Sequence, residues 1–217
     1  MPGVILAQLG PARNSPYVVD YPVGNSQTIY AGDWVVLSGA GSTTRVRKLT
    51  STDITNNYTE STVVKGILGM AMNDVITDSS GRAVSQMPVS GVHPQSQPIY
   101  TIPTTPAGFQ NEPTTGAARL RVAIADDETI FAIRMQGASN AAVTFNQSFQ
   151  GKECGIQIFS TINFAANTSA AGPAACLVIA GVMEMDPNFN VSSTQCYGLV
   201  RVKPAYQQFN LGVLYNA

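Results

Sequence analysis

The sequence is poor in charged residues. They make up 12% of its 217 residues, about half of the roughly 25% that is typical of globular proteins. Long solvated helices usually carry many Glu and Lys residues, so this composition favours strands and turns. The net charge is −1, with 12 basic and 13 acidic residues, which argues against nucleic acid or an anionic membrane as a partner. We therefore predict a mainly β protein with little helix.

The densest basic cluster does not change that expectation. Arg45, Arg47 and Lys48 alternate with apolar residues in the segment 43–49. Such alternation is typical of a strand with one solvated face. We interpret these side chains as an exposed strand face rather than as phosphate contacts.

Long apolar runs and paired cysteines are also missing. No apolar run approaches the roughly 18 residues of a membrane span, and no basic segment followed by an apolar core opens the chain. Cys154, Cys176 and Cys196 form no C-x-x-C pair, and an odd number of cysteines cannot pair fully within one chain. We expect free buried thiols and folding in a reducing cytoplasm.

Groups that could perform catalysis are few. His93 is the only histidine, and no G-x-S-x-G turn accompanies it. Acidic residues gather at 126–128 and at Glu184 with Asp186. Neighbours on a turn point apart, whereas a glycosidase needs two carboxyl groups that face each other, so we interpret residues 126–128 as a turn. We expect no enzymatic activity, cofactor or metal site; a hydrolase using Asp126 or Glu184 is a further hypothesis.

Two short apolar stretches predict the centre of the fold. Residues 31–39 contain the only tryptophan, Trp34, between turn residues, and this pattern predicts a buried strand. Residues 66–71 predict a second strand. Gly66 and Gly69 in that strand indicate a bend or the close approach of another backbone.

The chain divides into four segments. Residues 1–26 interleave Pro and Gly with apolar residues, which predicts an extended arm packed on its own domain or on a neighbouring subunit. Residues 27–77 predict a first β unit, and residues 78–118, rich in Pro, Gly and Thr, predict a long extended excursion. Residues 119–217 alternate with period two and predict a second β unit with an apolar C-terminal segment. Short strands separated by turns indicate β-sandwich or small β-barrel units.

Two motifs lie in the predicted central strands. Residues 32–35 read G-D-W-V, and residues 67–71 read I-L-G-M-A. This pair resembles the G-D-x-V strand and the following I-x-G-V-A-like strand of the capsid decoration (cement) proteins of tailed bacteriophages. Residues 125–133 and 198–203 are similar to strands of other phage head proteins.

The resemblance implies a virion structural protein. Such proteins are β-rich, bind the outer surface of an expanded capsid, often as homotrimers, and clamp neighbouring subunits. The implied partners are the major capsid protein and the chain itself, and the implied location is the capsid surface after synthesis in the bacterial cytoplasm. We expect the apolar ends of the chain to make the contacts, through Val4, Ile5, Leu6, Leu9, Tyr17, Val18, Tyr21, Tyr206, Phe209, Leu211 and Tyr215.

An alternative function is a receptor- or carbohydrate-binding module of a phage fibre or tail. Sugar-binding sites use aromatic faces, because these combine apolar area with a polar edge. The candidate aromatic residues are Tyr58, Tyr100, Phe109 and Tyr206.

Overall fold

The computed structural model describes residues 4–8, 17–39, 45–56, 66–83, 118–143, 147–160, 163–182 and 197–208. Strands dominate these residues, which confirms the prediction of a mainly β protein. The helical elements among them are short: α1 (Ser51–Thr55), η3 (Ala138–Asn140), η4 (Gln147–Phe149), η5 (Gly172–Ala174) and η6 (Pro204–Tyr206).

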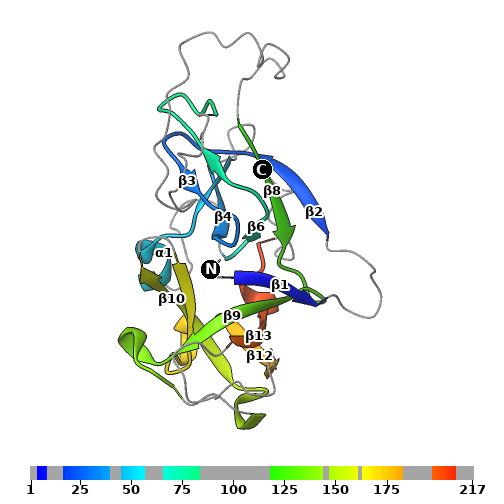
Figure 1. Cartoon of the computed structure of the whole chain (residues 1–217), viewed down its shortest axis with the longest axis vertical. Coiled ribbons are helices and arrows are strands. Elements are labelled where there is room, and N and C mark those ends of the chain that lie inside the picture. Colours follow the sequence, from blue (N-terminus) through cyan, green and yellow to red (C-terminus); the bar gives the residue numbers. More distant parts are fainter. Residues whose placement is uncertain are drawn as a thin grey trace, which may run out of the picture.

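The first sheet forms a barrel, drawn in the lower half of Figure 1. Its strands are β1 (Val4–Gln8), β9 (Ile130–Gln136), β10 (Glu153–Ser160), β11 (Asn163–Asn167), β12 (Leu177–Val182) and β13 (Tyr197–Val202). The order β9-β11-β10-β12-β13 closes on itself because β13 also pairs with β9. The pair β9–β11 is parallel, whereas the other pairs of this sheet are antiparallel. Strand β1 stands outside the ring and pairs with the first half of β9.

The second sheet has five antiparallel strands and lies in the upper half of Figure 1. In spatial order they are β2 (Val18–Pro22), β8 (Arg119–Ile124), β6 (Gly69–Ala71), β4 (Trp34–Ser38) and β5 (Arg45–Lys48). A parallel bridge between Val23 and Val46 brings its two edges together, so this sheet also curls. A two-stranded ladder, β3 (Thr28–Ile29) with β7 (Val75–Ile76), completes the strands.

The sheets do not follow the segment boundaries suggested by the sequence. Strand β2, from the predicted arm, and β8, from the predicted second unit, both join the sheet of β4 and β6. The alternation in β8 identifies a half-buried strand, since Arg119 and Arg121 are exposed and Leu120 and Val122 are buried. Alternation does not specify which strand will be its neighbour. Residues 84–117, most of the predicted excursion, lie outside the described residues.

The buried apolar residues form two clusters, one of which is shared by the barrel and the sheet. A first cluster fills the curled sheet, and a second fills the barrel and continues onto the opposite faces of β4, β6 and β8. Trp34 belongs to the second cluster and is fully buried. Its ring meets Phe131 of β9 at a centroid distance of 4.8 Å and an interplanar angle of 65°. The prediction of a buried strand around Trp34 is confirmed, and this strand joins the two units.

Gly66 and Gly69 lie where other backbones approach closely, as predicted. A Cβ atom on Gly69 would overlap the carbonyl oxygen of Ala123 in β8. A Cβ atom on Gly66 would overlap the carbonyl oxygen of Tyr206, and the φ angle of Gly66 is +104°. Glycine is required at both positions because any side chain would displace a neighbouring strand or segment.

The segment after β13 returns from the barrel to the sheet. Ile67 N–H donates to the carbonyl of Tyr206 (2.7 Å), and Gln208 N–H donates to the carbonyl of Ile67 (3.1 Å). The Gln208 side chain is fully buried, and its Oε1 accepts a hydrogen bond of 2.7 Å from Leu37 N–H. The Gln208 side chain therefore accepts a backbone hydrogen bond from β4, as the carbonyl of a neighbouring strand would.

Candidate functional site

The predicted arm is divided between the two sheets. Val4, Ile5 and Leu6 lie on β1, which pairs with Ile133, Ala132 and Phe131 of β9. Val18 and Tyr21 lie on β2 and are half-buried, and Tyr17 just before them is 43% exposed. The described strands of the arm, 4–8 and 18–22, thus pair with strands of the same chain; contact with a neighbouring subunit stays a prediction.

Of the predicted contact residues near the C-terminus, the structure describes Tyr206. Tyr206 is half-buried, donates its hydroxyl to the carbonyl of Pro173 (2.8 Å) and lies under the ammonium group of Lys203. The predicted residues Leu9, Phe209, Leu211 and Tyr215, with the aromatic candidates Tyr58, Tyr100 and Phe109, lie outside the described residues.

The turn interpretation of residues 126–128 is confirmed. Asp126 Oδ1 accepts hydrogen bonds from Glu128 N–H (3.0 Å), Thr129 N–H (2.9 Å) and Thr129 Oγ1 (2.8 Å). This is the pattern of an Asp that closes a turn with its own side chain. His93, Glu184 and Asp186 lie outside the described residues.

Other reactive groups are scattered in the part of the chain that the structure describes. It contains no group of three or more His, Cys, Asp or Glu side chains that could hold a metal ion. Cys154 and Cys176 are buried and form no disulfide, as predicted, and burial raises the pKa of Cys154; Cys196 lies outside the described residues. None of the described helices has the length and apolar character needed to cross a membrane.

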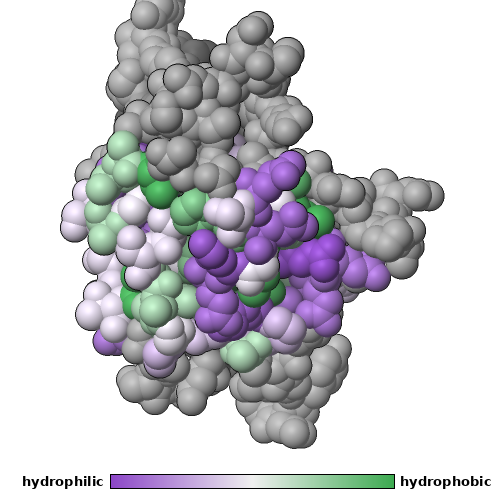
Figure 2. Space-filling view, turned by 90° about the horizontal axis from the view of Figure 1, so that it is seen from below, coloured by the Kyte–Doolittle hydropathy of each residue, from purple (hydrophilic) through white to green (hydrophobic). Residues whose placement is uncertain are grey.

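The described surface offers few apolar contacts. Its large exposed hydrophobic side chains are Tyr17 and Met72. In the coloured part of the face shown in Figure 2, green residues occur scattered among white and purple ones. Any partner of this surface therefore has to use polar groups or backbone edges.

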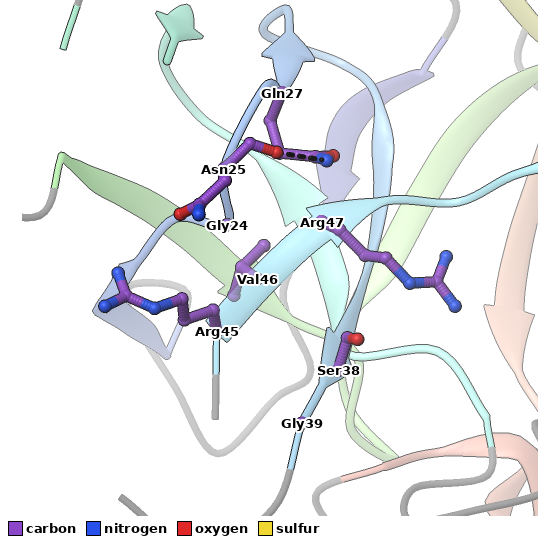
Figure 3. Close-up of a pocket in the computed structure, with 8 residues that line it drawn as sticks. All are labelled: Gly24, Asn25, Gln27, Ser38, Gly39, Arg45, Val46 and Arg47. Atoms are coloured by element: carbon purple, nitrogen blue, oxygen red, sulfur yellow. Dashed lines mark hydrogen bonds between the residues drawn. The ribbon is translucent and has the colours of Figure 1, made fainter. Parts of the chain in front are cut away.

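One hollow of about 290 Å³ opens beside β5 (Figure 3). Its lining residues are Gly24, Asn25, Gln27, Ser38, Gly39, Arg45, Val46 and Arg47. Arg45 and Arg47 extend in opposite directions from the strand, with Val46 between them. Arg45 Nη1 donates to the carbonyl of Val23 at 3.3 Å.

Arg47 is paired with a buried carboxylate. Its Nη1 and Nη2 each lie 2.7 Å from an oxygen of Asp53 on α1. Asp53 also accepts from Thr50 N–H and Thr50 Oγ1, both at 2.7 Å, and so completes the N-terminal cap of α1. Burial raises the pKa of Asp53, but these hydrogen bonds and the Arg47 charge outweigh it and hold the pKa below 3.8.

Lys48 is paired in the same way. Its ammonium group lies 2.8 Å from Asp33 Oδ2 and 5.5 Å from the centre of the Phe164 ring of β11. Burial raises the pKa of Asp33 more than Lys48 lowers it. The basic residues of β5 are half-buried, so the prediction of an exposed strand face is wrong for them. The reason is that Asp53 pairs with Arg47, Asp33 pairs with Lys48, and Arg45 donates to the carbonyl of Val23.

We expect Asp53→Asn to lower the free energy of unfolding by about 2 kcal/mol at pH 7, because Arg47 would be left half-buried without its partner. Since the folded pKa of Asp53 is below the unfolded 3.8, its contribution is present above pH 3.8 and is lost as the pH falls through the folded pKa. Urea unfolding of both chains over this pH range measures the difference.

The matched control is Asp20→Asn. The Asp20–Arg121 pair has a length of 3.4 Å, with side chains that are 50% and 63% exposed, so its loss should cost less than about 0.5 kcal/mol. Two outcomes would contradict the role given to the Asp53–Arg47 pair. One is an equal loss of unfolding free energy in the two variants, and the other is an effect of Asp53→Asn that is as large near about pH 2 as at pH 7.

A second hollow of about 340 Å³ lies on the outer face of β2 and β8. Asp20, Met72, Asn73, Arg119 and Arg121 line it. It differs from the first hollow because a carboxylate, Asp20, is itself one of its lining residues and pairs with Arg121.

No protein-family model, curated protein or solved structure matches this chain. The sequence did not single out the Arg45 hollow, because Asn25, Ser38 and Arg45 come from three separate segments. The alternation in β5, which places Arg45 and Arg47 on one face and the buried Val46 on the other, was the one available signal.

Proposed function

We propose that this chain is a virion structural protein that binds the outer surface of a phage capsid and clamps neighbouring capsid subunits. Its partners in this proposal are the major capsid protein and further copies of itself, in a homotrimer. The observation that carries the proposal is the position of β1 at the edge of its sheet.

Strand β1 has one neighbour. It pairs with β9 on one side, and no described strand pairs with its other side. An open edge presents backbone N–H and C=O groups that a strand of another subunit can join. The barrel ring closes without β1, so β1 can take part in such a contact while the fold stays intact.

Two further features support the proposal. The two motifs that resemble decoration proteins form neighbouring strands here, with Trp34 opposite Met70. The low charge of the chain suits dense packing on a lattice, because many copies of a highly charged protein would repel one another. Many copies also allow contacts that are individually weak to hold through avidity.

Deletion of residues 1–8 is expected to reduce binding to expanded capsids at least about tenfold, or about 1.4 kcal/mol, while the melting temperature changes by only a few degrees. The deletion stops before β2, because β2 supplies an edge of the second sheet. Co-sedimentation with purified capsids measures binding, and circular dichroism measures melting.

The control keeps the chain length and replaces residues 4–8 by Gly and Ser. It distinguishes the loss of strand β1 from the loss of chain length, and it should bind as weakly as the deletion. Full binding by both variants, or no binding of the natural chain to expanded capsids, would refute the proposal. Mass-spectrometric copy number in virions distinguishes the alternative: hundreds of copies fit a decoration protein, and a handful fits a fibre or tail module.

A further inference from the structure

We propose that the hollow around Arg45 binds the carboxylate of an acidic side chain of a protein partner. The partner need not be a capsid subunit. The protein itself holds the guanidinium group of Arg45 in place before any partner arrives.

Arg45 is half-buried, and its Nη1 is fixed by the carbonyl of Val23. The other guanidinium N–H groups have no acceptor among the described residues. A guanidinium offers a planar fork of donors that matches the two oxygens of a carboxylate. Because one donor is already anchored, less side-chain freedom is lost when a ligand binds.

The charge of the hollow is positive by one unit. Arg47, the second cation of the lining, is neutralised by Asp53 at 2.7 Å, and its side chain points away from Arg45 in Figure 3. No carboxylate lines the hollow among the described residues. A single carboxylate would balance this charge, whereas a phosphate group with nearly two negative charges would not.

Neutral polar groups surround the guanidinium. Asn25 also lines the hollow. Its Oδ1, a hydrogen-bond acceptor, would lie 2.7 Å from a Cβ atom on Gly81, and Arg45 Nη1 would lie 3.7 Å from that atom. Ser38 adds a hydroxyl group to the lining, whereas the Val46 side chain is fully buried and belongs to the core of the sheet. This combination suits an Asp or Glu side chain, whose carboxylate oxygens would accept hydrogen bonds from the guanidinium group and from the Ser38 hydroxyl.

The test is an NMR titration of the full chain with N-acetyl-glutamate methylamide at constant ionic strength. We expect saturable shifts of the backbone amides of Asn25, Ser38 and Val46. The uncharged probe N-acetyl-glutamine methylamide should bind at least about tenfold more weakly, because hydrogen bonds to charged groups are worth about 1.5–3 kcal/mol. Equal binding of the two probes would overturn the proposal.

Variants assign the effect to Arg45. Arg45→Gln should weaken binding at least about tenfold, and Arg45→Lys, which keeps the charge but loses the fork, should bind between Arg45→Gln and the natural chain. If Arg45→Gln does not fold, Arg45→Lys still decides, since it should bind more weakly than the natural chain. Arg121→Gln, in the second hollow, should bind the glutamate probe as the natural chain does. Unchanged binding in the Arg45 variants, or tighter binding of inorganic phosphate than of the glutamate probe, would overturn the proposal.

Discussion

Replacing Trp34 with alanine is expected to lower the free energy of unfolding by about 3–5 kcal/mol. Trp34 is fully buried, and its ring packs edge-on against Phe131 in the core that the sheet and the barrel share. Removal of the indole leaves a cavity between the two units, which the surrounding strands can fill only in part. Guanidinium unfolding followed by circular dichroism measures the loss.

Two variants serve as controls for Trp34→Ala. Trp34→Phe should cost less, because it keeps an aromatic ring and removes a buried Nε1–H that has no hydrogen-bond partner in the described structure. Tyr17→Ala should change the stability by no more than about 0.5 kcal/mol, since Tyr17 is 43% exposed. A Trp34→Ala chain that unfolds at the same denaturant concentration as the natural chain would show that the two units do not depend on a shared core.

Replacing Gly69 with alanine is expected to cost about 3 kcal/mol or more. The new Cβ atom would overlap the carbonyl oxygen of Ala123. That oxygen belongs to β8, which pairs with β6 through Gly69–Ile124 and Met70–Ala123. Since the obstacle is backbone rather than a flexible side chain, β8 has to move and the pairing is lost. Thermal unfolding and soluble yield measure the effect.

Gly181→Ala is the matched control for the Gly69 variant. Gly181 also lies in a strand, β12, but its added Cβ atom would meet nothing closer than Leu199 Cδ1 at 3.7 Å. This is an ordinary contact, so the change in stability should stay within about 0.5 kcal/mol. Similar losses in the two variants would mean that glycine content, and not the approach of β8, sets the cost.

Local features of the fold could be predicted from the sequence. An apolar run between turn residues identified the buried strand of Trp34, and glycines inside a strand identified close backbone approach at Gly66 and Gly69. The acidic run at Asp126 identified a turn. These features depend on a few consecutive residues, whose conformational preferences act locally.

Pairings between distant segments could not be predicted in the same way. Alternation shows that β8 is half-buried, but it is equally compatible with pairing to β9 or to β6. The parallel pair β9–β11 and the Arg45 hollow likewise depend on segments that meet only in the folded chain. Arg47 is half-buried because α1 places Asp53 beside it. The alternation of β5 alone does not predict this contact.

The hydrogen bond between Leu37 and Gln208 imposes an order on biosynthesis. These residues are 171 positions apart, so a ribosome adding roughly 5–20 residues per second needs about 10–30 s between them. During that interval the growing chain contains β4 but not yet Gln208, which accepts the hydrogen bond from Leu37 N–H. Contacts between residues so far apart in the sequence also form slowly. The sheet that contains β4 is therefore completed only after residue 208 has been synthesised.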